Sequence, residues 1–394
     1  MKILNNIITR GSSMNKMLLV VAMLLLCLGV AVVYTASAAQ AKAMGFGAEY
    51  YMMAHLKKAI PCFIIMLGIS RLDYGVWKVL GRVVFVAFFV LSVLALVKGG
   101  GVKGANRWIF GIQPSEFMKL GLLIWISAKL SEAGDNIKSV ACTIVQPAIP
   151  YGLCAMVLVL QPNFSMLIMI SAIVFTVMMI AGANLKYLAG ILGAVIPLGI
   201  LKLLFSTHSR ARIMAFFADE GQMVASNYQG DHALQALGNG GLFGTGYGMG
   251  LQKLGYLPEA HKDVVYAVIG EEIGFVGTFA VLMAFAILFS QGFKIAQNAS
   301  TRFGRYLALA LTLSLFFNFV VHVCVCVGLI PTTGQPLPFL SFGGTNLGYS
   351  CVAVGILLNI SRANSGRKIN EPYMSGSSLD SSVFRNFGFS RSGV

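Results

Sequence analysis

Long apolar segments that carry almost no charge recur along this chain and restrict what it can fold into. Each is about 20 residues long, which is the length that a helix needs to cross the ~30 Å hydrocarbon core of a bilayer. The segments are continuous rather than alternating, so we exclude a membrane β-barrel. Charged residues make up only 11% of the 394 residues, against about 25% in soluble domains. This composition excludes an ordinary soluble enzyme, a disordered protein and a nucleic-acid-binding domain.

We predict an all-α, polytopic integral membrane protein with about ten transmembrane helices and one long extracytoplasmic loop. The predicted spans are 17–36, 56–70, 79–98, 117–130, 140–160, 164–182, 187–205, 264–291, 305–328 and 339–360. The membrane domain covers 17–362 and includes the long outer loop 206–263. Residues 1–16 and 363–394 are polar tails, predicted to be cytoplasmic, and the second is predicted to be disordered.

The net charge of +15 is spread over short loops between spans, a pattern that serves membrane orientation rather than nucleic-acid binding. The tails and the segments 71–82 and 293–305 are basic, which places both termini in the cytoplasm and Asp263 outside. Residues 17–36 follow basic residues as a signal peptide does, but so much apolar sequence follows that we expect an uncleaved span. The seven cysteines lie in apolar stretches, so we expect buried thiols, with neither disulfides nor a metal site.

Unusual residues gather on the predicted outer side, beginning before the fourth span. Arg107 and Trp108 precede Ser115, a candidate N-cap, and Glu116 and Lys119 have the i, i+3 spacing that lets them pair on one helix face. Ionisable groups entering a span are expensive and usually functional. The alternative is a capped helix start with Trp108 as an interface residue.

The long outer loop holds two further clusters. Residues 238–250 contain seven glycines, which is typical of tight turns or of close approach to a ligand, although the segment fits no P-loop. The segment 253–274 is rich in ionisable groups, namely Lys253, Glu259, His261, Lys262, Asp263, Glu271 and Glu272. A carboxylate at a half-dry boundary suits a general base. His261 could equally be a solvated loop residue, and Glu271 or Glu272 could be structural.

The fourth cluster, 328–344, contains prolines and glycines that interrupt a helix and free backbone polar groups. Such groups are tolerated at membrane depth only when they are buried in protein or line a wet cavity. Ser341, Gly343 and Gly344 are therefore candidates for substrate binding. The alternative is a re-entrant turn with a structural role only. Lys57 and Lys58, at the start of the second span, are read as residues that snorkel to the interface.

Together these clusters resemble the SEDS family of shape, elongation, division and sporulation proteins. The resemblance covers nearly all of 17–362. The motifs that carry it are Trp108-Ile109, Gln113-Pro114-Ser115-Glu116-Phe117, the run Leu257–Gly274 and the run Pro331–Gly344. Tyr34-Thr35-Ala36-Ser37 and Gly270-Glu271-Glu272 are more similar to the division branch than to the elongation branch. The chain departs from the family pattern at Asn106, Asn163, Lys262 and Phe342.

The resemblance implies a peptidoglycan glycosyltransferase that polymerises lipid II, an undecaprenyl-diphosphate-linked substrate, at the outer face of the cytoplasmic membrane. It also implies a class B penicillin-binding protein transpeptidase and other divisome proteins as partners, alongside membrane lipids and without nucleic acid. The family's essential acidic residue matches Asp263, and Arg107 and Lys119 match positions on which the family relies.

Chemistry then assigns roles. The attacking sugar hydroxyl needs a base, for which Asp263 is the candidate. The departing diphosphate needs positive charge, which Arg107, Lys119 and Lys253 would supply. A divalent cation such as Mg or Mn is an additional candidate for this role. No metal-ligand set is visible in the sequence. The candidate substrate-binding residues are Arg107, Trp108, Glu116, Lys119, Lys253, Glu259, His261, Ser341, Gly343 and Gly344.

Three alternatives stay open: a lipid II flippase, an elongation-type paralogue and a non-catalytic division scaffold. A transporter also has intramembrane charges and broken helices, but it needs a charged path to the inner side, whereas these clusters lie outside. For the partner transpeptidase we predict a contact along 275–320, where Gly277, Ala280 and Ala284 share one helix face.

Overall fold

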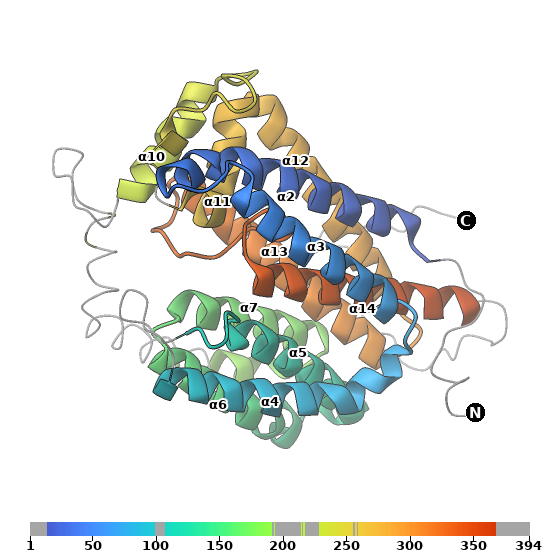
Figure 1. Cartoon of the computed structure of the whole chain (residues 1–394). Helices are drawn as coiled ribbons and strands as arrows, with labels where there is room; N and C mark the ends of the chain where they lie inside the picture. Colours follow the sequence, from blue (N-terminus) through green and yellow to red (C-terminus); the bar gives the residue numbers. More distant parts are fainter. Residues whose placement is uncertain are drawn as a thin grey trace.

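The computed structural model describes residues 14–98, 107–190, 193, 214, 216, 228–254, 257 and 259–367 (Figure 1). Within these residues every regular element is a helix, apart from isolated β-bridge residues at Leu72, Ile109 and Ile112. The elements are α2 (Lys16–Ala43), α3 (Tyr50–Ile69), η1 (Tyr74–Val76), α4 (Trp77–Lys98), α5 (Pro114–Ala133), η2 (Gly134–Lys138), η3 (Ala141–Val145), α6 (Gln146–Leu160), α7 (Phe164–Ile180), α10 (Tyr228–Gly240), η4 (Gln252–Leu254), α11 (Ala260–Asp263), α12 (Val265–Gln297), α13 (Arg302–Cys326) and α14 (Gly344–Arg367).

Nine of the ten predicted spans coincide with described helices, and the remaining one, 187–205, lies largely outside the described residues. Among the described residues, six helices are long and apolar enough to cross a membrane, namely Lys16–Ala43, Tyr50–Ile69, Tyr74–Lys98, Ala141–Leu160, Val265–Gln297 and Arg302–Cys326. The prediction of an all-α polytopic membrane protein is therefore confirmed. The predicted start of the last span at 339 is wrong, because the proline-containing segment before Gly344 is not helical.

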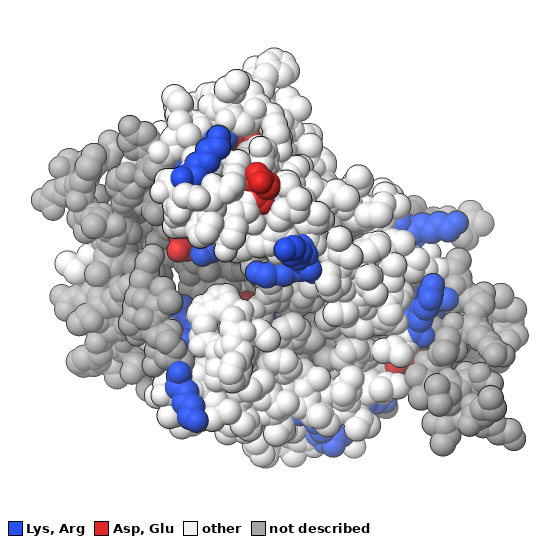
Figure 2. Space-filling model, in the orientation of Figure 1, with Lys and Arg blue, Asp and Glu red and all other residues white. Residues whose placement is uncertain are grey.

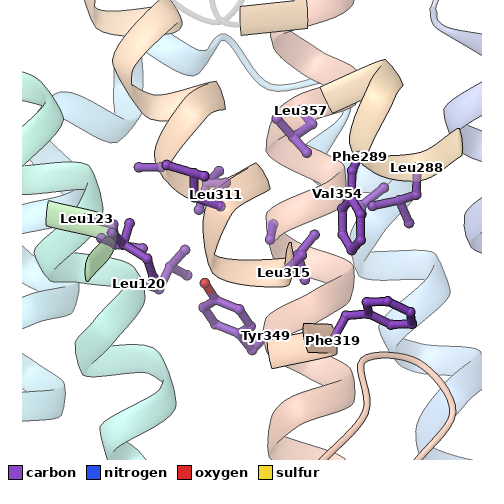
Figure 3. Packing of buried hydrophobic residues seen from close by; sticks show 14 of the residues in the cluster. Leu120, Leu123, Leu288, Phe289, Leu311, Leu315, Phe319, Tyr349, Val354 and Leu357 are labelled. Atoms are coloured by element: carbon purple, nitrogen blue, oxygen red, sulfur yellow. The ribbon is translucent and has the colours of Figure 1, made fainter. Parts of the chain in front are cut away.

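The helices pack side by side, with α13 and α14 between a group formed by α2, α3 and α12 and a group formed by α4 to α7 (Figure 1). Apolar side chains from four of these helices meet in the interior (Figure 3). They are Leu120 and Leu123 of α5, Leu288 and Phe289 of α12, Leu311, Leu315 and Phe319 of α13, and Tyr349, Val354 and Leu357 of α14. This core holds the helix ends, and with them the polar clusters, in fixed positions.

The start of α2 lies beside the last turns of α14, since the amide of Asn15 donates to Ser361 Oγ at 3.1 Å. The Asn15 side chain also caps α2 by accepting from the amide of Leu18 at 3.0 Å. Both helix ends therefore lie at one end of the bundle, as expected for termini on one side of the membrane. That this side is cytoplasmic stays a prediction.

The helix α12 is broken at Gly274, which has φ 73° and ψ −164°. In an unbroken helix the amides of Phe275 and Val276 would donate to the carbonyls of Glu271 and Glu272. The glycine-rich loop lies between these groups and replaces those two bonds with four. The four bonds run from Thr245 N to Glu271 O (2.9 Å), Gly246 N to Glu272 O (3.0 Å), Phe275 N to Gly241 O (2.9 Å) and Val276 N to Leu242 O (3.2 Å).

The carboxylates of Glu271 and Glu272 hold the same loop from the side. Glu271 Oε1 accepts from the amides of Leu251 and Gln252, at 2.8 and 3.1 Å. Glu272 Oε2 accepts from the amide of Gly248 at 3.1 Å. The structural interpretation of this acidic pair is therefore the one that the contacts support. Gly240 and Gly244 allow the loop backbone to lie directly against α12, because a β-carbon there would overlap the carbonyl oxygens of Gly270 and Glu272, respectively.

We expect Gly274→Ala to destabilise the protein by about 2–6 kcal/mol. Gly274 has a backbone conformation that is essentially restricted to glycine, which costs another residue about 1–3 kcal/mol. Overpacking adds about 1–3 kcal/mol, because a β-carbon would overlap the amide nitrogen of Gly244 and lie 2.6 Å from the carbonyl oxygen of Leu242. Gly248→Ala is the matched control, since Gly248 has φ +80° but open space around it. Thermal melts in detergent should show a clearly larger shift for Gly274→Ala, and equal shifts would contradict the packing argument.

Candidate active site

Asp263 is the last residue of the short helix α11, and the chain turns at Val264 before α12 begins. Its side chain is half-buried. The segment 328–343 lies against it, because a β-carbon at Gly334 would be 3.8 Å from Asp263 Oδ2. Gly334 has φ +67°, which a glycine adopts without strain. The carboxylate therefore faces the proline-containing loop, at the end of the bundle opposite Asn15.

The two neighbouring charges of α11 pair with each other. Lys262 Nζ lies 3.6 Å from Glu259 Oε2, and both side chains are about 40% exposed. An exposed pair of this kind contributes little to stability. Lys262, the departure from the family pattern beside Asp263, is thus directed toward Glu259, which the sequence analysis proposed as a substrate-binding residue.

His261 is buried rather than solvated. Its ring centroid lies 4.8 Å from that of Tyr51 and 5.3 Å from that of Phe342, and its carbonyl accepts the amide of Phe342 at 2.8 Å. Neither ring nitrogen has a hydrogen-bond partner within the described part of the chain. His261 therefore joins α11 to the segment before α14, and the interpretation as a solvated loop residue is wrong.

Burial lowers the pKa of His261 from 6.5 to about 4, and the charge of Lys262 adds to this shift. The folded protein thus keeps His261 neutral between these values, whereas the unfolded chain takes up a proton near pH 6.5. Because the unfolded state binds more protons in this window, stability is lost as the pH falls from 6.5 to 4. The expected contribution of this one residue is at most about 3 kcal/mol.

Thermal melts between pH 7 and 4.5 measure this effect. His261→Phe is the control, because it keeps a ring against Tyr51 and Phe342 but cannot titrate. We expect the melting temperature of His261→Phe to fall less steeply with acid than that of the wild type. Parallel curves would show that His261 does not carry the acid sensitivity.

Lys58 belongs to the same cluster and was missed by sequence reasoning, which treated it as a snorkelling residue. Its Nζ lies 4.8 Å from the ring centroid of Phe342, and its side chain would contact a β-carbon at Gly344, the first residue of α14. Among the described residues no carboxylate pairs with it. A lysine pair at the outer end of a span was the only sequence signal.

The N-terminus of α14 carries a partial positive charge from its unpaired amides. Lys58 adds a full charge beside it, and the space around Gly343 is open. Ser341 shapes this segment from within, since its buried Oγ accepts the amide of Leu337 at 2.8 Å. Gly343 and Gly344 therefore lie where an anion would be attracted, whereas Ser341 fixes the loop.

The pairing of Glu116 with Lys119 is confirmed. Lys119 Nζ lies 2.8 Å from Glu116 Oε2 and 4.1 Å from the ring centroid of Tyr349, with side-chain exposures of 0% for Lys119 and 2% for Glu116. The ammonium is fully buried in this structure, which favours a supporting role, and direct diphosphate binding by Lys119 stays a prediction. The predicted N-cap at Ser115 is also wrong, because α5 begins with Pro114 after Gln113, and proline is favoured at the first helical position.

The remaining predicted cations are engaged elsewhere. Arg107 donates through Nε to the carbonyl of Gln161 at 2.8 Å and through a terminal nitrogen to that of Pro162, so it joins the start of α5 to the end of α6. Lys253 is buried and paired with Glu272 beneath the glycine-rich loop. Trp108 is 42% exposed, as expected for an interface residue.

Figure 2 shows that one face of the molecule is hollowed between the group that contains α2 and α3 and the group that contains α4 and α6. Acidic and basic side chains gather at the left end of this hollow, where α11 lies in Figure 1. The fold and site thus define a polytopic membrane protein with an acid and a cation near one end of its helix bundle.

The chain belongs to the FtsW/RodA/SpoVE family of cell cycle proteins, whose sequence pattern matches residues 15–366. A protein of Trichlorobacter lovleyi named "Probable peptidoglycan glycosyltransferase FtsW" is 35% identical over 350 residues, which cover 87% of this chain and 92% of the relative. Stage V sporulation protein E of Bacillus subtilis is 34% identical over 362 residues, covering 90% of this chain and 98% of the relative.

Solved structures share the fold. A chain from a peptidoglycan synthase complex superposes with a TM-score of 0.70 at 22% identity, covering 89% of this chain and 98% of its own length. The rod shape determining protein RodA of Thermus thermophilus gives a TM-score of 0.66 at 22% identity, with the same coverage. At this identity the likeness concerns the fold alone, and it extends over almost all of both chains.

Proposed function

We propose that this chain is a peptidoglycan glycosyltransferase that polymerises lipid II at the outer face of the cytoplasmic membrane during cell division. The observation that supports this most is the arrangement around Phe342. Its ring contacts His261, two residues before Asp263, and lies under the ammonium of Lys58. A carboxylate and a cation thus lie on one connected cluster, at the open N-terminus of α14.

The reaction forms a bond between a sugar hydroxyl oxygen and the anomeric carbon of a second lipid-linked sugar, and breaks the bond from that carbon to the diphosphate. Asp263 accepts the hydroxyl proton as the general base. Lys58 and the N-terminus of α14 stabilise the negative charge of the departing diphosphate. A single base on one side of the sugar fits a displacement with inversion.

Lys119, Arg107 and Lys253 act at a distance in this proposal. Lys119, paired with Glu116, fixes α5 against Tyr349 of α14, and Arg107 fixes the turn that precedes α5. Both position the walls of the site without contacting the substrate. Lys253 supports the glycine-rich loop through Glu272 in the same way.

A divalent cation enters the proposal only as a counterion of the substrate diphosphate. Across the described ranges, no group of three or more His, Cys, Asp or Glu side chains is arranged to hold a metal ion. Mg or Mn would thus arrive bound to diphosphate oxygens, and Asp263 is the carboxylate of the proposed site that would approach it. Polymerisation assays with and without chelator measure this dependence.

A class B penicillin-binding protein is the proposed partner, together with other divisome proteins at the division septum. The contact surface predicted from small residues needs revision, because Gly277 is buried in the structure. Large apolar side chains of α12 are exposed instead, namely Phe275, Val276, Phe279, Leu282 and Met283. We propose this face, which includes Ala280, for the partner's membrane helix.

The test is glycan strand formation from labelled lipid II by the purified chain, alone and with its transpeptidase partner. Polymer that lengthens with time supports the proposal. Transfer of lipid II between leaflets of a vesicle without polymer would instead support the flippase alternative. Absence of both activities in the assembled complex would support a scaffold.

A further inference from the structure

His322 lies on α13, 1% exposed, and is bonded on both sides to backbone groups. Its Nδ1 lies 2.9 Å from the carbonyl oxygen of Gln335, and its Nε2 lies 3.4 Å from the amide nitrogen of Tyr266. A carbonyl only accepts and an amide only donates, so these partners assign the tautomer. Nδ1 carries the proton and donates it to Gln335, and Nε2 accepts from Tyr266.

The two bonded segments are the ones that flank Asp263. Tyr266 follows Asp263 by three residues and lies in the first turn of α12, where a helix leaves its amides without internal partners. Gln335 adjoins Gly334, which lies against the Asp263 carboxylate. The imidazole thus joins the backbone that carries the carboxylate to the loop that faces it.

We propose that His322 is a positioning residue that sets the place of Asp263 relative to the loop 331–343. This inference rests on the proposed role of Asp263 as the general base. A displacement of about 1 Å in a catalytic group can lower a rate on the order of 10²-fold. A single rigid ring that makes both bonds is suited to prevent such a displacement.

Other roles for His322 fit the contacts less well. A metal ligand needs a ring nitrogen with a free lone pair, and a proton carrier needs a nitrogen that reaches the substrate. Both nitrogens of His322 are instead occupied by backbone groups in the interior. Protonation would also remove the acceptor for Tyr266, so the neutral ring is the form that holds the two segments.

Amide side chains can imitate the two bonds separately. The amide nitrogen of His322→Asn takes the place of Nδ1 and keeps the bond to Gln335, whereas the carbonyl oxygen of His322→Gln takes the place of Nε2 and keeps the bond to Tyr266. His322→Leu removes both bonds. Asn318→Leu is the matched control, because Asn318 lies one turn away on the same face of α13, is 1% exposed and has no hydrogen-bond partner among the described residues.

We expect kcat for lipid II polymerisation to fall about 10²-fold in His322→Leu and by a smaller factor in each amide variant. KM should change little, because His322 contacts no substrate, and Asn318→Leu should keep the wild-type kcat. Wild-type kcat in all three His322 variants would overturn the proposal. A raised KM with unchanged kcat would also overturn it, since it would indicate direct substrate contact.

Hydrogen–deuterium exchange separates this inference from the proposed activity. His322→Leu should raise exchange in peptides covering 264–268 and 333–337, whereas Asn318→Leu should raise exchange in neither peptide. Each amide variant should raise exchange only in the segment whose bond is lost, which is 264–268 for His322→Asn and 333–337 for His322→Gln. These two variants test the inference even if His322→Leu does not fold. Unchanged exchange in both segments would refute the positioning role, whereas a wild-type protein that makes no glycan would refute only the proposed function.

Discussion

Asp263→Asn is expected to lower the rate of glycan polymerisation by about 10²–10⁴-fold, which is the usual contribution of a general base. Asn has nearly the same size as Asp and can still accept a hydrogen bond, but it cannot take up a proton at neutral pH. Because Asp263 is half-buried at a helix end, the fold should tolerate the change. The measurement is glycan chain formation from lipid II by the purified variant with its partner, with a thermal melt as the folding check.

Glu259→Gln is the matched comparison for this experiment. Glu259 lies four residues before Asp263 at the same end of the bundle, but it is 41% exposed, and its ion-pair partner among the described residues is Lys262. We expect it to keep activity within a few-fold of the wild type. Wild-type activity in Asp263→Asn together with loss of activity in Glu259→Gln would assign the base role to Glu259 instead.

Lys119→Met alone is expected to destabilise the protein by about 3–5 kcal/mol, because it leaves the Glu116 carboxylate buried without its cation. Such a loss would lower the melting temperature strongly or prevent folding. The double variant Glu116→Leu/Lys119→Met removes both charges and keeps similar volumes, and Met retains a favourable contact with the Tyr349 ring. Replacing both partners of a buried pair is often neutral or stabilising, so most of the stability should return.

Activity of the double variant then separates two roles for Lys119. If Lys119 only fixes α5 against α14, polymerisation should recover together with stability. A double variant that melts like the wild type but makes no glycan would show that the ammonium acts on the substrate after all. In that case the burial seen here would describe a state that opens during the reaction.

The helices and the Glu116–Lys119 pair were predictable because both depend on local spacing. A continuous apolar run needs no distant information to form a helix in a bilayer, and an i, i+3 pair is set by helix geometry. Whether this pair faces the interior of the bundle or its outside was not predictable. Since α5 is apolar on most of its surface, with Leu120, Leu122, Leu123 and Ile124 all buried, its sequence does not distinguish an inward from an outward face.

The features that could not be predicted depend on contacts between residues that are far apart in the sequence. The proximity of Lys58 to Gly344 joins residues far apart in the sequence, and neither residue has a pattern that identifies the other. His261 is polar and adjoins Lys262, so its burial depends on Tyr51 and Phe342 from two other segments. The break in α12 was hidden because one glycine in an apolar helix is common, and its partner loop lies about 30 residues earlier.

The interleaving of that loop with α12 also bears on how the chain is made. The backbone groups exposed by the break would be costly in hydrocarbon without partners. Their partners, residues 241–246, are synthesised before residues 271–276, so the loop has already left the ribosome when the broken helix enters the bilayer. Loop and helix become stable only together, and a nascent chain halted before Glu271 would hold a loop without any of these four bonds.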